Sequence, residues 1–191
     1  MFLLRKPTAQ ILADVRNVNR DTPLSYNEVG DSRGKPPEGY VVDRNRVRLG
    51  SGSATFERAR QALKSWQMLQ LGWVKPCWPD ATLREGELVG TQARVCGLWV
   101  INVCRIVYVD ETASEVGHEF SFAYGTLKGH VERGEERFRI EWQHADDSVW
   151  YEIVAFSKPG TWLSKVGYPY VRYQQRRFAR DSLQAIRNHV T

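Results

Sequence analysis

Residues 99–109, WVINVCRIVYV, decide the fold class of this chain. Their side chains alternate with a period of two residues, as in a β-strand whose successive side chains point to opposite faces. One face is expected to carry Trp99, Ile101, Val103, Val107 and Val109, and the other Val100, Cys104, Ile106 and Tyr108. Since both faces are apolar, we predict that this strand is covered on both sides or faces a cavity on one.

The period of two continues on both sides of this stretch, which predicts an antiparallel sheet of seven strands. The other six strands are expected at 40–49, at 73–74, at 88–96, at 118–127, near 138–142 and near 150–156. Turn residues at 145–148 indicate a hairpin between the last two. A sheet of this size is large enough to curl.

Helices are predicted where apolar residues recur three and four positions apart. They are expected at 8–17, from Thr55 to Gly72, and over 170–190 after Pro169, with a small turn at 162–166 before the last one. A final helix of about 20 residues is about 30 Å long, enough to fill the concave side of the sheet. The predicted fold class is therefore α+β, a curved seven-stranded antiparallel sheet around a long C-terminal helix.

The chain of 191 residues has the length of one domain. Residues 1–39 are predicted to be an N-terminal extension, because the segment 21–39 is rich in proline and glycine and indicates a long surface connection. Residues 40–191 are predicted to form the single domain.

Composition excludes several classes of protein. With 26% charged residues and a mean hydropathy of -0.48, the chain is neither a membrane protein nor a long disordered one. No apolar stretch approaches the roughly 20 residues of a transmembrane helix, and the first residues lack the core of a signal peptide. We therefore predict a cytoplasmic protein. The three cysteines have no CxxC spacing, which argues against a disulfide framework or a zinc site.

A series of short motifs follows one another along the chain. They are SYNEVG at 25–30, FERAR at 56–60, NVCR at 102–105, YGTLKGH at 124–130, GEERF at 134–138, AFSKP at 155–159 and QQRRF at 174–178. Together they resemble the DUF1990 (UPF0548-type) family of uncharacterised proteins over nearly the whole chain from Ser25. Because that family has no established activity, the resemblance implies no catalytic residue.

The order of the predicted elements resembles the helix-grip fold of the Bet v 1-like and START-like (SRPBCC) superfamily. In that superfamily the sheet and the last helix enclose an apolar pocket, so the resemblance implies a cavity for a small hydrophobic or amphipathic ligand. The leading hypothesis is a binding module that needs no cofactor. The predicted ligand-binding residues are Tyr124, Arg105, Trp99, Phe122, Trp142 and Phe156.

The polar segment 129–136, GHVERGEE, gives an alternative hypothesis. Its glycines would allow a loop over the mouth of the pocket, where His130 with Glu132 or Glu135 would form the acid–base pair of a cyclase, hydrolase or lyase. The other interpretation is a hairpin whose carboxylates pair with nearby arginines. Together with His118, these side chains match no metal-ligand spacing, so no metal site is predicted.

The C-terminal helix gives a third hypothesis. Arg172, Arg176 and Arg180 are four residues apart and share one face, which would suit phosphates or acidic lipid headgroups. The net charge of +5 also favours an anionic partner. The other interpretation is the solvated face of an amphipathic helix. No nucleic-acid motif accompanies the arginines, so nucleic acid is not expected as a partner, and the sequence leaves the oligomeric state open.

Overall fold

The computed structural model describes residues 1–160 and 167–191, and the turn predicted at 162–166 lies outside them. The helices are α1 (Ala9–Val18), α2 (Ser53–Lys64) and α4 (Tyr168–Val190), with short 3-10 turns η1 (Asp31–Arg33) and η2 (Gln67–Leu69). The strands are β1 (Phe2–Leu3), β2 (Val41–Ser51), β3 (Val74–Pro76), β4 (Leu88–Val95), β5 (Leu98–Ala113), β6 (Gly117–Thr126), β7 (Glu132–Gln143) and β8 (Ser148–Pro159).

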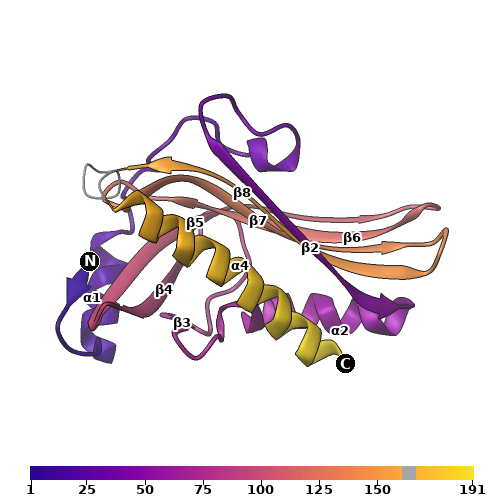
Figure 1. Ribbon diagram of the computed structural model, residues 1–191, viewed down its shortest axis with the longest axis horizontal. Coiled ribbons are helices and arrows are strands. Elements are labelled where there is room, and N and C mark those ends of the chain that lie inside the picture. Colours follow the sequence, from indigo (N-terminus) through magenta and orange to yellow (C-terminus); the bar gives the residue numbers. More distant parts are fainter. Residues whose placement is uncertain (161–166) are drawn as a thin grey trace.

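Seven strands pair antiparallel in the order β2-β8-β7-β6-β5-β4-β3, and β1 pairs with β5 as a short eighth strand. The sheet curves around α4, which crosses its concave side (Figure 1). The predicted α+β class, with a curved seven-stranded sheet around a long C-terminal helix, is confirmed.

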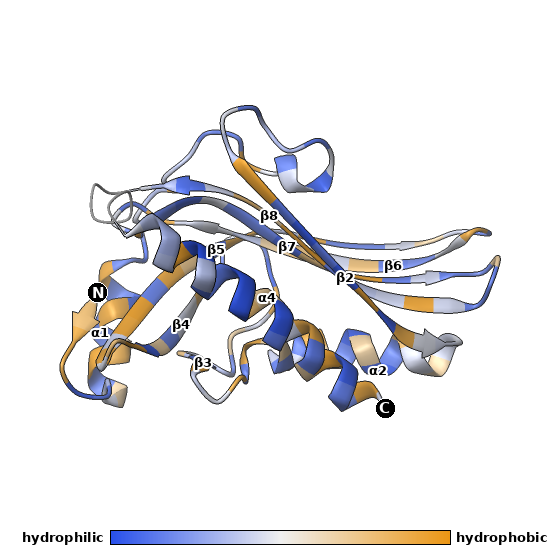
Figure 2. Cartoon of the chain, in the orientation of Figure 1, coloured by the Kyte–Doolittle hydropathy of each residue, from blue (hydrophilic) through white to orange (hydrophobic). Residues whose placement is uncertain are grey.

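The core lies between the concave face of the sheet, α2 and the C-terminal half of α4. The rings of Phe122 and Phe138 stack with centroids 5.2 Å apart, and Trp66 meets Phe122 edge-on at 5.6 Å. From α4, Ile186 is fully buried in this cluster. The hydrophobic bands of α4 lie towards its C-terminal end, whereas its first turns are mostly hydrophilic (Figure 2). The two halves of α4 therefore face different surroundings.

The helix predicted to run to Gly72 is too long, because α2 ends at Lys64. Trp66 then adopts the left-handed conformation, with φ 58°. Its ring is 1% exposed, and its indole N–H donates to the Ala81 carbonyl at 2.9 Å. Burial of this large side chain, together with its hydrogen bond, offsets the backbone strain and ends the helix early.

The predicted face assignment of residues 99–109 is wrong after Ile106. Ile106 pairs with Tyr124, but the register then shifts so that Tyr108 pairs with Ala123. This β-bulge turns Tyr108 to the convex face and Val109 towards the core. A bulge inserts one extra residue into a strand, so strict alternation along the sequence cannot reveal it.

The loop predicted at 129–136 is also corrected, since β7 begins at Glu132. In the ladder Glu136 pairs with Tyr124, and Glu135 pairs with Phe156. Gly134 has a φ of 150°, and a Cβ there would lie 1.9 Å from the Phe156 carbonyl oxygen. The glycine thus permits the close approach of β8, and the charged residues that suggested a loop belong to a strand.

The convex face is covered by the segment that joins α1 to β2, which lies on the side of the sheet away from α4 (Figure 1). The Tyr26 ring packs edge-on against Phe156 at 5.8 Å. Its hydroxyl approaches Gly125 so closely that a Cβ there would lie 2.1 Å from the oxygen. A side chain at position 125 would therefore displace Tyr26 from the sheet.

Candidate functional site

A cavity of about 480 Å³ lies between the concave face of the sheet and the N-terminal half of α4. Its walls are largely apolar. Among the apolar residues that line it are Leu69, Val89, Val100, Ile153, Phe178 and Ala179. From α4 the lining includes Gln174 and Gln175 as well as Val171 and Phe178, so this half of the helix presents a mixed polar and apolar surface to the cavity.

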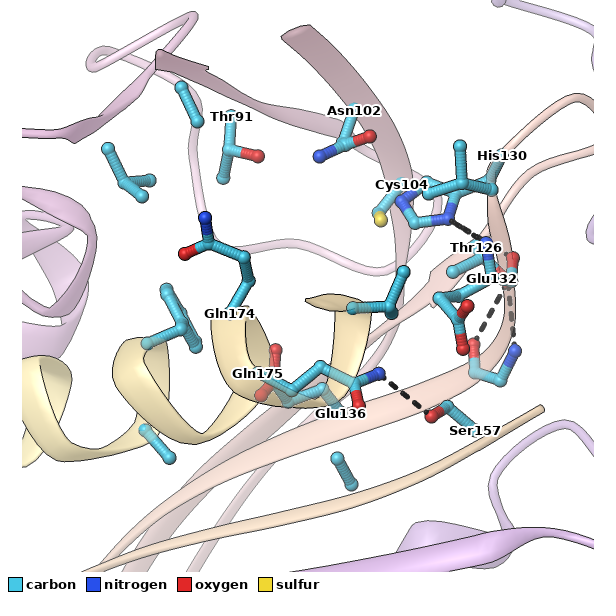
Figure 3. Close-up of a pocket in the computed structure, with 18 of the residues that line it drawn as sticks. Thr91, Asn102, Cys104, Thr126, His130, Glu132, Glu136, Ser157, Gln174 and Gln175 are labelled. Atoms are coloured by element: carbon cyan, nitrogen blue, oxygen red, sulfur yellow. Dashed lines mark hydrogen bonds between the residues drawn. The ribbon is translucent and has the colours of Figure 1, made fainter. Parts of the chain in front are cut away.

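Polar side chains from several elements also reach the cavity wall (Figure 3). Among them are Thr91, Asn102, Tyr124, His130, Glu132, Glu136, Gln174 and Gln175. The two carboxyl groups come from β7, four residues apart, so they share the concave face of that strand. Glu132 lies with His130 at one end of the cavity, and Gln174 lies on the other side (Figure 3).

The carboxylate of Glu132 has no hydrogen-bond partner within the described ranges 1–160 and 167–191. The residue is only 7% exposed. Burial raises the pKa of its carboxyl group, and the nearby Ser157 hydroxyl and the positive charge of Arg172 offset this only in part. A buried carboxylate without a partner is costly, so this group needs a specific explanation.

Glu136 has one hydrogen-bond donor, the hydroxyl of Tyr124 at 2.7 Å. Burial raises the pKa of the Glu136 carboxyl to about 7, while the bond from Tyr124 lowers it and the negative charge of Asp43 raises it further. This carboxyl group can therefore change protonation near neutral pH.

The imidazole of His130 is bound to the backbone next to it. Its Nδ1 accepts a hydrogen bond from the Glu132 amide at 3.0 Å. Burial lowers the pKa of His130 to about 4, so the ring is neutral at physiological pH. Nδ1 also lies 3.1 Å from the Glu132 carbonyl oxygen, to which the other neutral tautomer would donate.

Two contacts fix α4 over the cavity. The guanidinium of Arg172 donates to both carboxylate oxygens of Asp43 in β2, at 2.5 and 2.6 Å. The amide of Gln175 donates to the Ser157 hydroxyl in β8 at 3.2 Å. These bonds tie the first turns of the helix to the edge of the sheet where apolar packing is sparse.

Glu135 lies on the opposite face of β7 from Glu132 and Glu136. Its carboxylate accepts from the Tyr26 hydroxyl at 2.7 Å and from the Gly30 amide at 2.8 Å. The amide of Ser32, at 3.2 Å, and its hydroxyl donate as well. Glu135 thus anchors the N-terminal segment to the convex face, and none of its hydrogen bonds to described residues joins it to His130.

Of the residues predicted from the sequence, Tyr124, His130 and Glu132 lie on the cavity wall. Glu135 and Phe156 also border the cavity, but their side chains contact Tyr26 on the convex face. Since alternate residues of a strand point to opposite faces, these two side chains cannot also reach the cavity.

The other four predicted ligand-binding residues lie elsewhere. Arg105 donates to the carbonyls of Asn19 and Arg20 after α1. Three aromatic residues lie away from the cavity as well. Trp99 pairs with Leu3 of β1, and Phe122 is in the closed core. Trp142 packs against His118 and His144 at the far end of the sheet. Aromatic alternation alone could not distinguish a filled core from a cavity wall.

The arginines of α4 are mostly paired. Arg172 is bound to Asp43, and Arg180 donates to Asp181 on the same helix. Arg176 is exposed and lines the mouth of the cavity. The predicted anion-binding face therefore has a carboxylate next to two of its three guanidinium groups.

Sequence reasoning missed Glu136, Asn102 and Gln174 as cavity residues. For Glu136 a signal was available, because positions 132, 136, 138 and 140 share one face of a strand once the strand is extended to residue 132. Gln174 had no such signal, since a glutamine on a helix is ordinarily exposed.

Within the described residues, no group of three or more histidine, cysteine or acidic side chains is arranged to hold a metal ion. In the same part of the chain, no helix is both long and apolar enough to cross a membrane.

Comparison with known proteins places this architecture in a family. Residues 25–185 match the family described as "Domain of unknown function (DUF1990)". The chain belongs to this family. A UPF0548 protein of Dictyostelium discoideum is 36% identical over 95% of this chain and 92% of its own. A UPF0548 protein of Deinococcus radiodurans is 38% identical over 94% of each chain. The resemblance of the sequence motifs to DUF1990 is thereby confirmed.

Solved structures support the fold. The protein TTHA0849 from Thermus thermophilus aligns with a TM-score of 0.54 at 12% identity, over 78% of this chain and 97% of its own. The ginseng major latex-like protein 151 from Panax ginseng aligns with a TM-score of 0.51 at 13% identity, over the same shares. These likenesses concern the fold alone, and they agree with the helix-grip arrangement of the DUF1990 chain.

Proposed function

We propose that this DUF1990 protein binds a small hydrophobic or amphipathic molecule in the cavity between the sheet and α4. The observation that carries the proposal is the cavity itself, whose volume of about 480 Å³ lies in the range of small-molecule sites. Its walls are mostly apolar, and a few polar groups at defined positions would orient the guest. The cytoplasmic location of the protein stays a prediction from the sequence.

Affinity in such a site comes from removing apolar surface from water, at about 25 cal/mol per Å². The cost of immobilising a small ligand offsets part of this gain, so we expect dissociation constants on the order of micromolar for a simple apolar probe. N-phenyl-1-naphthylamine is an uncharged probe of suitable size whose fluorescence rises when it leaves water.

The test is a fluorescence titration of the protein with this probe. Wild type is expected to bind it, and Ala179→Trp, which places a ring inside the cavity, is expected to weaken binding by roughly tenfold or more. The matched control is Gln184→Trp, which adds the same ring to the exposed side of α4. Ala155→Leu in β8 is a second, milder filling variant. Equal binding by the filled and control proteins would refute the proposal.

A further inference from the structure

Glu132 is the one carboxylate of the described cavity wall whose two oxygens both lack a hydrogen-bond partner. It is more than nine-tenths buried, and Figure 3 shows it at the end of the cavity next to His130. Its own backbone amide is used by His130 Nδ1, which fixes the position of the residue at the start of β7. The protein thus holds, in a defined place inside the cavity, a carboxylate that makes no hydrogen bond to a described residue, although the Ser157 hydroxyl lies near enough to lower its pKa in part.

The described charged groups nearby do not neutralise Glu132. The positive charge of Arg172 acts on Glu132, but both terminal nitrogens of Arg172 are engaged, by Asp43 and by Gln175. The set of Asp43, Arg172 and Glu132 therefore carries a net charge of -1 when both acids are ionised. Arg176 is exposed at the cavity mouth, and Glu136 adds a further acidic group to the wall.

We propose that the natural ligand of this cavity carries a cationic group, of the protonated amine class, which binds the Glu132 carboxylate while its apolar part contacts the walls. The proposal rests on the proposed function and specifies its ligand. Glu136 lies four residues further along β7, about 13 Å away by strand geometry, so it acts as a separate polar contact.

The electrostatics agree with this assignment. An ionised carboxylate in a low-dielectric cavity loses much of its hydration, and burial raises the pKa of Glu132 accordingly. An ammonium group next to it restores the balance and adds charge-assisted hydrogen bonds, which are stronger than neutral ones. An anionic head group at the same place would instead be repelled by the Glu132 carboxylate.

The experiment compares three probes with the same apolar tail, decylamine, decanol and decanoate, at neutral pH. Each displaces N-phenyl-1-naphthylamine from wild type, Glu132→Gln and the control Glu115→Gln, whose carboxylate is exposed in the turn between β5 and β6. Decanol reports the contribution of the tail alone. Thermal unfolding verifies that each variant is folded, and Glu132→Met is a second uncharged variant.

We expect wild type to bind decylamine roughly tenfold or more tightly than decanol, and decanoate more weakly than either. In Glu132→Gln and Glu132→Met the preference for the amine should disappear, whereas Glu115→Gln should retain it. If the dye binds but the amine shows no advantage over the alcohol, or the advantage survives loss of Glu132, the cationic ligand is refuted and the binding function stands. If the dye does not bind wild type at all, both proposals fail.

Discussion

Strand β7 carries carboxylates on both of its faces, and the two faces surround them differently. On the convex face, Glu135 accepts four hydrogen bonds from Tyr26, Gly30 and Ser32. On the concave face, Glu136 has one donor and Glu132 has none among the described residues. All three belong to one strand, so the difference comes from what covers each face.

The segment that joins α1 to β2 covers the convex face (Figure 1). On the concave face, a cavity remains between the sheet and the N-terminal half of α4. The same convex surface also holds the buried ion pair of Arg137 and Glu152, at 2.8 Å. Buried polar groups in folded proteins are ordinarily satisfied, as they are around Glu135. Glu132 lies beside an open cavity without such partners among the described residues, and under the proposed function this face is kept for a ligand at a cost in stability.

The largest effect is expected where the satisfied network is broken. Glu135→Gln places an amide group against backbone and hydroxyl donors that need an acceptor, so we predict a loss of about 4 kcal/mol in the free energy of unfolding. Urea denaturation measures it. Glu115→Gln, at an exposed carboxylate, should change stability by less than about 0.5 kcal/mol. A similar small effect of both substitutions would contradict a structural role for Glu135.

A smaller effect should appear in the pH dependence of stability. The folded pKa of Glu136 is about 7, above its ordinary value of 4.5, so the folded state holds this proton more tightly than the unfolded state. The stabilisation that Glu136 contributes is complete below about pH 4.5 and is lost as the pH rises through about 7, up to ~3 kcal/mol in total.

His130 acts in the opposite direction between about pH 4 and 6.5, because burial lowers its pKa. The comparison of wild type with Glu136→Gln removes this contribution, since both proteins contain His130. Denaturation at a series of pH values should show wild type losing stability relative to Glu136→Gln as the pH increases. A difference that stays constant with pH would show that Glu136 is not buried as described.

The smallest effect on the free energy of unfolding is expected at Glu132, where substitution should stabilise the protein instead of destabilising it. Glu132→Gln removes a buried charge that has no described partner, so we predict that it stabilises the protein by about 1 kcal/mol at neutral pH. Thermal or urea unfolding measures the change. Destabilisation instead would mean that Glu132 has a structural partner, and its part in the comparison with Glu135 would be lost.

The periodicity of apolar residues predicted the strands of the sheet and the last helix, because the type of each element is visible in the spacing of residues close together in sequence. The strand at 99–109 and the helix that begins at Tyr168 illustrate this. The failures came from the bulge after Ile106, from the early end of α2 at Lys64, and from β7, whose charged start suggested a loop. The boundary at residue 39 stays a prediction, as do the roles of the predicted site residues.

The sequence by itself determined the family, the α+β class and the alternating faces of the strand at 99–109 up to Ile106, since these follow from local spacing and from motifs along the chain. Only the tertiary structure decided which face of β7 is closed and which is hollow. The donors of Glu135 lie more than 100 residues away in sequence, and the space beside Glu132 depends on where α4 rests. Partners and cavities result from packing between distant segments, which no local pattern records.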